Sequence, residues 1–175
     1  MVDVDAVKAG FTSSRIDMAR FSLIVWFIVE QRWRYIIEKE LEPDGITAKQ
    51  WLMAIVVGNA FQSPPSIQEV ADAMSTTHQN VKQIAAGMER RGWVTLERDP
   101  DNKRIVRLKV TDRCRELFIA REENDKAAIL RMFENLSDDE LKALFDIVAK
   151  MESRAEQMYT GAKKARLGSG KEAEG

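Results

Sequence analysis

The sequence contains few of the residues that disulfides and metal sites require. It has one cysteine and one histidine among 175 residues. A single cysteine cannot form an intramolecular disulfide, and one His with one Cys cannot supply the three or four ligands of a typical zinc site. The most apolar stretch, Phe21 to Val29, meets Glu30 and Arg32 well before the roughly 20 apolar residues of a membrane span.

Targeting and catalytic motifs are missing as well. The opening MVDVDAVKAG lacks the basic region and apolar run of a signal peptide, so we expect a cytoplasmic protein. There is no glycine-rich phosphate loop, no Ser/His/Asp order typical of nucleophilic catalysis, and one His for acid–base work. We therefore expect neither an enzyme nor a cofactor, and no membrane partner.

Charge is distributed unevenly along the chain. The net charge is formally −1, so the molecule as a whole gives no sign of a polyanionic partner. Between Thr76 and Arg113, however, nine basic residues stand against five acidic ones. A basic middle between acidic flanks points to a local binding surface.

The first half of the sequence predicts helices. Ser13 or Ser14 can cap a long helix that ends before Pro43 and Gly45. Thr47 has the capping-box spacing to the Gln three residues on, which starts a second helix towards residue 60. Both helices carry apolar residues at three- and four-residue steps.

Two shorter helices follow, separated by a tight turn. Ser66 and Glu69 form another capping-box pair that starts the first, and a polar turn at Ser75 stops it. Thr77 caps the second, which runs to Gly92 with one apolar stripe and one polar face.

A β-hairpin and two long helices complete the prediction. Trp93–Leu96 and Ile105–Val110 are predicted strands, and the loop between them has the Pro, Asp and Asn content of an exposed turn. A helix follows from Thr111 to about Glu134, and another begins at Ser137.

This order of elements indicates DNA binding. A short helix, a turn and a second helix with polar side chains at its start is the arrangement that places one helix in the major groove, where Gln and Asn can pair with adenine and Lys with guanine. Long cations on a hairpin suit the minor groove or its phosphates. The predicted DNA contacts are Thr76, Thr77, His78, Gln79, Asn80, Lys82 and Gln83 on the helix, and Arg98, Lys103 and Arg104 on the hairpin.

These stretches resemble a known family, the MarR-type winged-helix regulators, from about Phe11 to Tyr159. The matching segments are ITAKQWLMAIV, SIQEVADAMSTTHQNVKQIAAGMERRGWV and RDPDNKRIVRLKVT. In the wing, Asn102, Lys103 and Arg104 stand where the family has an Asp and two basic residues, with an acid one residue early, and Arg104 matches the groove-inserting arginine.

The resemblance implies a mainly α (α+β) winged helix-turn-helix fold and a homodimer held by the first helix and the last two. It also implies a transcriptional regulator, in our interpretation a repressor, that binds a palindromic operator and is released by a small phenolic or amphipathic ligand. The expected segments are 1–45, an N-terminal helix of the dimerisation region; 46–111, the winged helix-turn-helix; 112–160, the C-terminal dimerisation helices; and 161–175, a disordered tail.

Two alternatives remain open for the function. The first is a winged-helix module that binds another protein and no DNA, which would call for an apolar surface on the helix after Thr77. The second is a thiol-based redox sensor acting through Cys114, for which reactivity needs a lowered pKa. If Cys114 is not a redox sensor, it is an inert thiol packed on an amphipathic helix.

An effector site is predicted from aromatic residues. Phe21, Trp26 and Trp51 fit the lining of a ligand cavity, because aromatic side chains often line such sites. Their helical spacing is equally expected of plain core and dimer packing.

Overall fold

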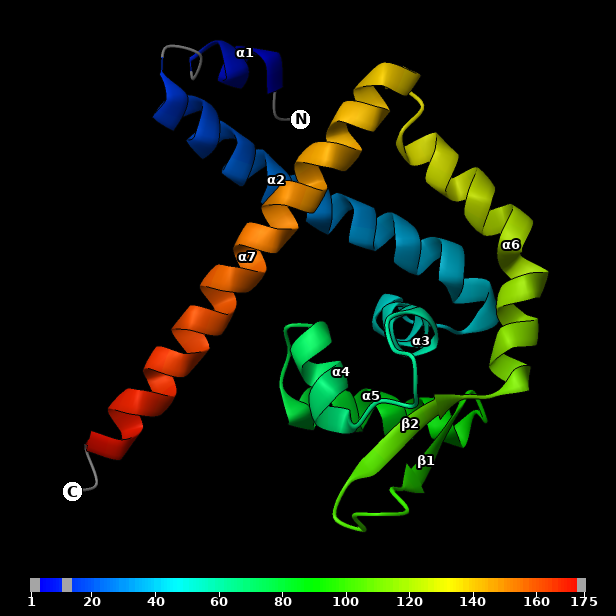
Figure 1. The fold of residues 1–175 in the computed structure, drawn as a ribbon. Helices are drawn as coiled ribbons and strands as arrows, with labels where there is room; N and C mark the ends of the chain where they lie inside the picture. Colours follow the sequence, from blue (N-terminus) through cyan, green and yellow to red (C-terminus); the bar gives the residue numbers. More distant parts are fainter. Residues whose placement is uncertain (1–3, 11–13, 173–175) are drawn as a thin grey trace. The chain divides into compact units, whose positions relative to one another are not determined.

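The computed structural model describes the backbone of residues 4–10 and 14–172 (Figure 1). The elements in chain order are α1 (Val4–Ala9), α2 (Arg15–Leu41), the 3-10 turn η1 (Glu42–Asp44), α3 (Ala48–Asn59), α4 (Ile67–Ala73), α5 (His78–Arg90), β1 (Val94–Arg98), β2 (Val106–Val110), α6 (Asp112–Met132) and α7 (Asp138–Glu172). The fold is therefore mainly helical with one two-stranded hairpin, as the sequence predicted.

The chain divides into two compact units, and the division falls inside α6. One unit ends at Lys126 and the other begins at Ala127. The first contains the short helices and the hairpin, and the second contains the end of α6 and all of α7. Each unit is described by itself below.

Capping residues start the helices where the sequence predicted. The Thr47 hydroxyl accepts the N–H of Gln50 at 3.2 Å, and the Gln50 side chain accepts the N–H of Thr47 at 3.1 Å. Ser66 and Glu69 exchange the same pair of bonds at the start of α4, at 3.2 and 2.7 Å. Reciprocal bonds of this kind satisfy donors that a helix start leaves open.

The core of the first unit lies between α3, α4, α5 and the hairpin. Val81, Ala85 and Met88 of α5 are buried at helical spacing, so one stripe of this helix faces inward. They join Met53 of α3 and Leu108 of β2, both fully buried. The helix that follows Thr77 is therefore held on its apolar side by the core.

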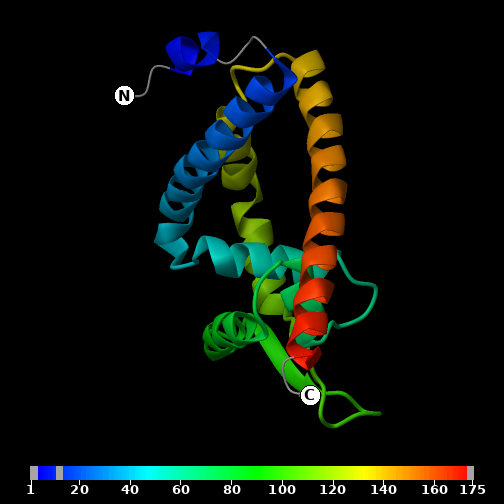
Figure 2. The same ribbon diagram turned by 90° about the vertical axis from the view of Figure 1, so that its left-hand side faces the viewer.

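The hairpin is antiparallel and rests on the segment before α4. Its register runs from Val94 opposite Val110 to Arg98 opposite Val106. The Leu108 N–H donates to the Pro65 carbonyl at 2.8 Å, just before α4 begins. The hairpin loop extends away from α3, α4 and α5 in both views (Figure 1, Figure 2).

Arg121 anchors α6 to the end of α2. Its side chain is 6% exposed and forms ion pairs with Asp44 of η1 and Asp125 of α6. It also donates to the Glu40 carbonyl at 3.1 Å. A planar guanidinium can join several acceptors at once, so this residue holds the middle of α6 against the α2–η1 junction.

The long helices expose many apolar side chains. Those of α2 include Ile16, Leu23, Ile24, Trp26, Phe27, Tyr35 and Ile36, and those of α7 include Leu141, Phe145, Ile147, Met151 and Met158. No helix among the described residues is long and apolar enough to cross a membrane.

The structure differs from the sequence prediction at both ends. The short helix α1 was not predicted. The helix α7 continues to Glu172, through most of the segment 161–175 for which the sequence predicts a disordered tail; residues 173–175 lie outside the described part of the chain. The run AKKARL at 162–167 consists of residues that favour helix, and extending a helix already formed needs no new nucleation.

Candidate nucleic-acid interface

The first turn of α5 presents polar side chains on a rigid frame. The Thr77 hydroxyl accepts the Asn80 N–H at 3.1 Å and so caps the helix. His78, Gln79, Lys82 and Gln83 are all exposed, while the opposite side of the helix is buried in the core. These side chains therefore lie at a helix start, where the backbone N–H groups also favour an anion.

Thr76 and Asn80 bond to each other. The Asn80 amide donates to the Thr76 hydroxyl at 2.9 Å, and both residues are half-buried. The preceding Ser75 has a positive φ of 48°, which closes the turn between α4 and α5. The pair stabilises this turn, so within the predicted set the exposed residues of α5 are better placed for base contacts than Asn80.

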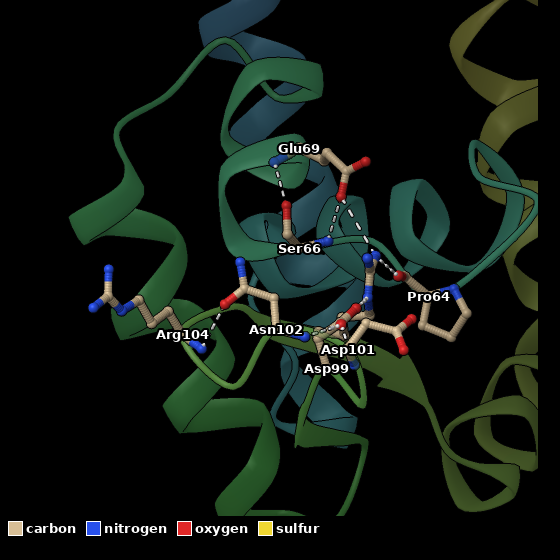
Figure 3. Close-up of polar contacts among 8 residues, drawn as sticks. Pro64, Ser66, Glu69, Asp99, Asp101, Asn102 and Arg104 are labelled. Atoms are coloured by element: carbon tan, nitrogen blue, oxygen red, sulfur yellow. Dashed lines mark hydrogen bonds and ion pairs between the residues drawn. The ribbon is translucent and has the colours of Figure 1, made fainter.

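The hairpin loop presents two cations. Lys103 and Arg104 are exposed, and Arg98 donates to the Lys103 carbonyl at 3.2 Å across the base of the loop. Figure 3 shows the Arg104 side chain directed away from the other labelled residues. Arg98 therefore helps to close the loop, whereas Lys103 and Arg104 are available at its surface.

Asp99 organises this loop and was not among the predicted site residues. One carboxylate oxygen accepts the N–H groups of Asp101 and Asn102 at 2.9 and 2.8 Å. The Asn102 side chain in turn accepts the Arg104 N–H at 3.1 Å. Asp and Asn accepting from the backbone two residues on is the ordinary chemistry of Asx turns, so the D-x-D-N spelling was a signal for this arrangement.

The Asp99 carboxylate is held ionised. The ion pair with Arg107 and the N–H bonds from Asn102 and Asp101 lower its pKa below the ordinary value of 3.8. Because the pKa of Asp99 is lower in the folded protein than in the unfolded chain, its contacts stabilise the fold at any pH above the ordinary pKa. This stabilisation is lost as the pH falls through the pKa of the folded state. The loop is therefore intact throughout the physiological range.

The part of the chain that carries this arrangement is similar to a known family. The family model described as MarR family matches residues 44–105, the segment that contains α3, α4, α5 and the hairpin loop. This segment of the chain is therefore similar to the MarR family, as the sequence predicted.

Solved structures of MarR proteins share its fold. A MarR protein from Peptoclostridium difficile is 16% identical, with 86% of this chain and 93% of that chain covered and a TM-score of 0.72. A MarR regulator from Methanosarcina mazei is 14% identical, covering 79% and 99%, with a TM-score of 0.72. Wild-type MarR from E. coli is 20% identical, covering 73% and 93%, with a TM-score of 0.63. These likenesses show that the chain has the winged-helix fold of MarR proteins.

Cys114 has the environment of an inert thiol. It is 1% exposed within the core, and burial raises the pKa of its thiol although Arg115 opposes the shift. Thiolate chemistry needs exposure and a lowered pKa, so the geometry does not favour the redox-sensor alternative. No group of three or more His, Cys, Asp or Glu side chains that could hold a metal occurs among the described residues.

The structure places the predicted effector residues in different surroundings. Trp51 of α3 packs against the core, Phe21 of α2 is half-buried, and Trp26 of α2 is 45% exposed. One described hollow on α2, of about 480 Å³, is lined by Gln31, Arg32, Tyr35 and Ile36 and includes none of the three. A site formed by these aromatics stays a prediction.

Proposed function

We propose that this MarR-family regulator binds a palindromic operator in double-stranded DNA as a homodimer. The observation that carries the proposal is the two-faced α5: its apolar side is fixed in the core while its first turn exposes polar side chains. A helix presented in this way fits the major groove, which is about 12 Å wide. The alternative of a winged helix that binds only protein would call for an apolar face here.

The proposal assigns different roles to the two parts of the interface. Gln79, Lys82 and Gln83 read base edges, where amides suit adenine and an ammonium suits guanine. Thr76, Thr77, His78 and Asn80 contact phosphates or hold the helix start. Arg98, Lys103 and Arg104 bind the adjacent minor groove or its phosphates, where the potential is strongly negative.

The dimer follows from the apolar side chains of the long helices. MarR-family regulators typically bind DNA as dimers, and α2 and α7 expose large apolar residues that a second copy would cover. Two-fold symmetry then predicts half-sites about 10 to 10.5 base pairs apart. We propose that segments 1–45 and 112–160 serve dimerisation and 46–111 serves DNA binding.

Fluorescence anisotropy tests the DNA-binding proposal. The protein is titrated into labelled DNA from upstream of its own gene and into a scrambled control, at two salt concentrations. Nanomolar, salt-sensitive binding that prefers the native DNA is expected. Equal, weak binding to both DNAs, and to further fragments of the surrounding genome, would contradict it.

Two variants locate the interface. Arg104→Ala should weaken binding and reduce the salt slope of log K by about one, for one lost phosphate contact. Arg90→Ala, at the other end of α5, removes the same charge and should leave affinity nearly unchanged. Equal effects of the two substitutions would mean that only overall charge matters.

We propose further that the protein is a cytoplasmic repressor that a small phenolic or amphipathic ligand releases from DNA. The aromatic side chains of Phe21, Trp26 and Trp51 support this part, since such groups bind aromatic ligands. A phenolic ligand should raise the melting temperature of the free protein and weaken operator binding. Absence of both effects across a panel of phenols would remove the effector from the proposal.

A further inference from the structure

Arg107 of β2 connects three elements of the winged region. Its Nε bonds to the Asp99 carboxylate at the end of β1, and its Nη1 donates to the Pro64 carbonyl before α4 at 2.9 Å. The same nitrogen lies 3.8 Å from the Glu69 carboxylate of α4. One guanidinium therefore bridges the hairpin and the first helix of the helix-turn-helix.

The connection continues to the loop that carries Arg104. Asp99 uses one oxygen for Arg107 and the other for the N–H groups of Asp101 and Asn102, and Asn102 accepts the Arg104 N–H. Figure 3 shows these bonds as a continuous series between Glu69 of α4 and Arg104. The position of Arg104 is thereby linked to α4 by polar contacts at every step.

We propose that Arg107 is a positioning residue, which sets the angle of the hairpin against the helix-turn-helix and so places Arg104 on the DNA. The inference rests on the proposed function. In this proposal Arg107 orients the hairpin and does not itself bind phosphate, because its positive charge is already neutralised by the carboxylates of Asp99 and Glu69.

Two physical arguments support a geometric role. A two-stranded hairpin has little stability of its own and takes its orientation from what it packs against. The guanidinium is planar and can bond acceptors in several directions at once, which an ammonium cannot reproduce. The Asp99 side chain is 8% exposed and that of Arg107 is 32% exposed. The carboxylate of this ion pair is therefore buried from solvent, whereas the guanidinium is partly accessible.

A charge-opposed variant tests the role of the pair. Asp99→Asn removes a negative charge near the DNA, which by electrostatics alone would tighten binding. If the pair positions the wing, affinity for the operator should instead fall, by about tenfold. Asp101→Asn, whose own carboxylate is exposed, makes the same charge change and should bind at least as tightly as wild type. Tighter binding by Asp99→Asn would overturn the proposal.

A double-mutant cycle tests the link to Arg104. In an Arg107→Met background, Arg104→Ala should cost much less affinity than in wild type, because Arg104 is already misplaced. Gln79→Ala should cost the same in both backgrounds. Lys109→Met, on the same strand, loses one charge and should leave the Arg104→Ala effect intact. Additive effects of Arg107→Met and Arg104→Ala would contradict the inference.

Hydrogen exchange on the free protein separates this inference from the proposed function. Arg107→Met should speed exchange at the amides of Asp101, Asn102 and Arg104 and leave those of α5 unchanged, whether or not DNA binds. Arg107→Lys, the milder substitution, should show the same pattern if Arg107→Met does not fold. If Arg107→Met leaves hydrogen exchange in the loop unchanged, the positioning role is overturned, even when the wild-type protein binds its operator. If the wild-type protein shows no preference for the operator, the proposed function is refuted instead.

Discussion

The winged region and the long helices use their apolar residues in opposite ways. In α5 the apolar stripe is buried and the rest of the surface is polar. In α7 no described side chain is buried, and Phe145 is 71% exposed. The first region closes its own core, whereas the second has more apolar surface than its own fold covers. The comparison teaches that the chain closes one part of its apolar surface on itself and leaves another part uncovered.

The difference follows from the width of each apolar surface. A helix with one narrow apolar stripe is satisfied by a single neighbouring surface, whereas a helix that is apolar on several sides requires burial on several. The exposed apolar residues of α2 are spread around the helix, whereas those of α7 form one broad apolar face. The four predictions below test this division between a closed core and an uncovered surface.

The largest effect should come from the closed core. Leu108→Ala removes a fully buried side chain of β2 and should lower the free energy of unfolding by about 2–5 kcal/mol, since a cavity remains. Urea unfolding followed by circular dichroism measures it. Ile119→Ala, at an exposed position of α6, is the matched control and should change stability by less than about 1 kcal/mol in the monomer. Similar losses for both variants would mean that the core is not closed as described.

The next effect concerns the anchor at the end of α2. Arg121→Met leaves Asp44 and Asp125 without their shared cation and should cost about 1–3 kcal/mol of unfolding free energy. Arg115→Met breaks an exposed ion pair with Asp112 and should cost less than about 1 kcal/mol. The comparison is measured by urea unfolding, and equal costs would show that Arg121 contributes no more than a surface charge.

Charging the uncovered surface should affect assembly rather than folding. Phe145→Glu places an unpaired charge on the apolar face of α7, which should weaken the dimer by about tenfold or more, or roughly 1.4 kcal/mol. Sedimentation velocity over a range of concentrations measures the monomer fraction. Lys150→Gln makes the same change in net charge at a polar position and should leave the dimer intact. A dimer that withstands Phe145→Glu would place the interface elsewhere.

The smallest expected signal is the slow reaction of the Cys114 thiol with a disulfide reagent in the native protein. Burial and the raised pKa of its thiol predict that a disulfide reagent reacts slowly with the native protein and rapidly after unfolding. Reaction rates with and without denaturant at mildly alkaline pH measure the protection. Rapid reaction of the native protein would reopen the redox-sensor alternative and would show that this part of the core opens.

Local signals explain what the sequence predicted correctly. The capping boxes at Thr47 and Ser66, the cap at Thr77 and the helix end at Gly92 each depend on residues within a few positions of one another, and all four are confirmed. The hairpin also lies within two residues of its predicted bounds. The MarR family was recognisable because these signals follow one another in a fixed order.

Contacts between distant residues explain what was missed. Arg121 meets Asp44 across 77 positions of sequence, and Arg107 meets Pro64 across 43; no periodicity links such pairs. The Asp99–Arg107 contact spans only eight positions, but it could be seen only once the hairpin register was known. The Asn80–Thr76 bond was missed because a polar residue on a DNA-facing helix was expected to point outward.

The buried thiol also makes the chain convenient for spectroscopy. Cys114 is the only cysteine in the sequence and lies within the core, so a cysteine introduced by Asp101→Cys, at an exposed position of the hairpin loop, would be the one readily accessible to a dye. A donor and an acceptor attached there on two copies would report the separation of the two hairpin loops. The spread of the wings, with and without DNA or a phenol, could then be followed on single molecules in a chain otherwise unaltered.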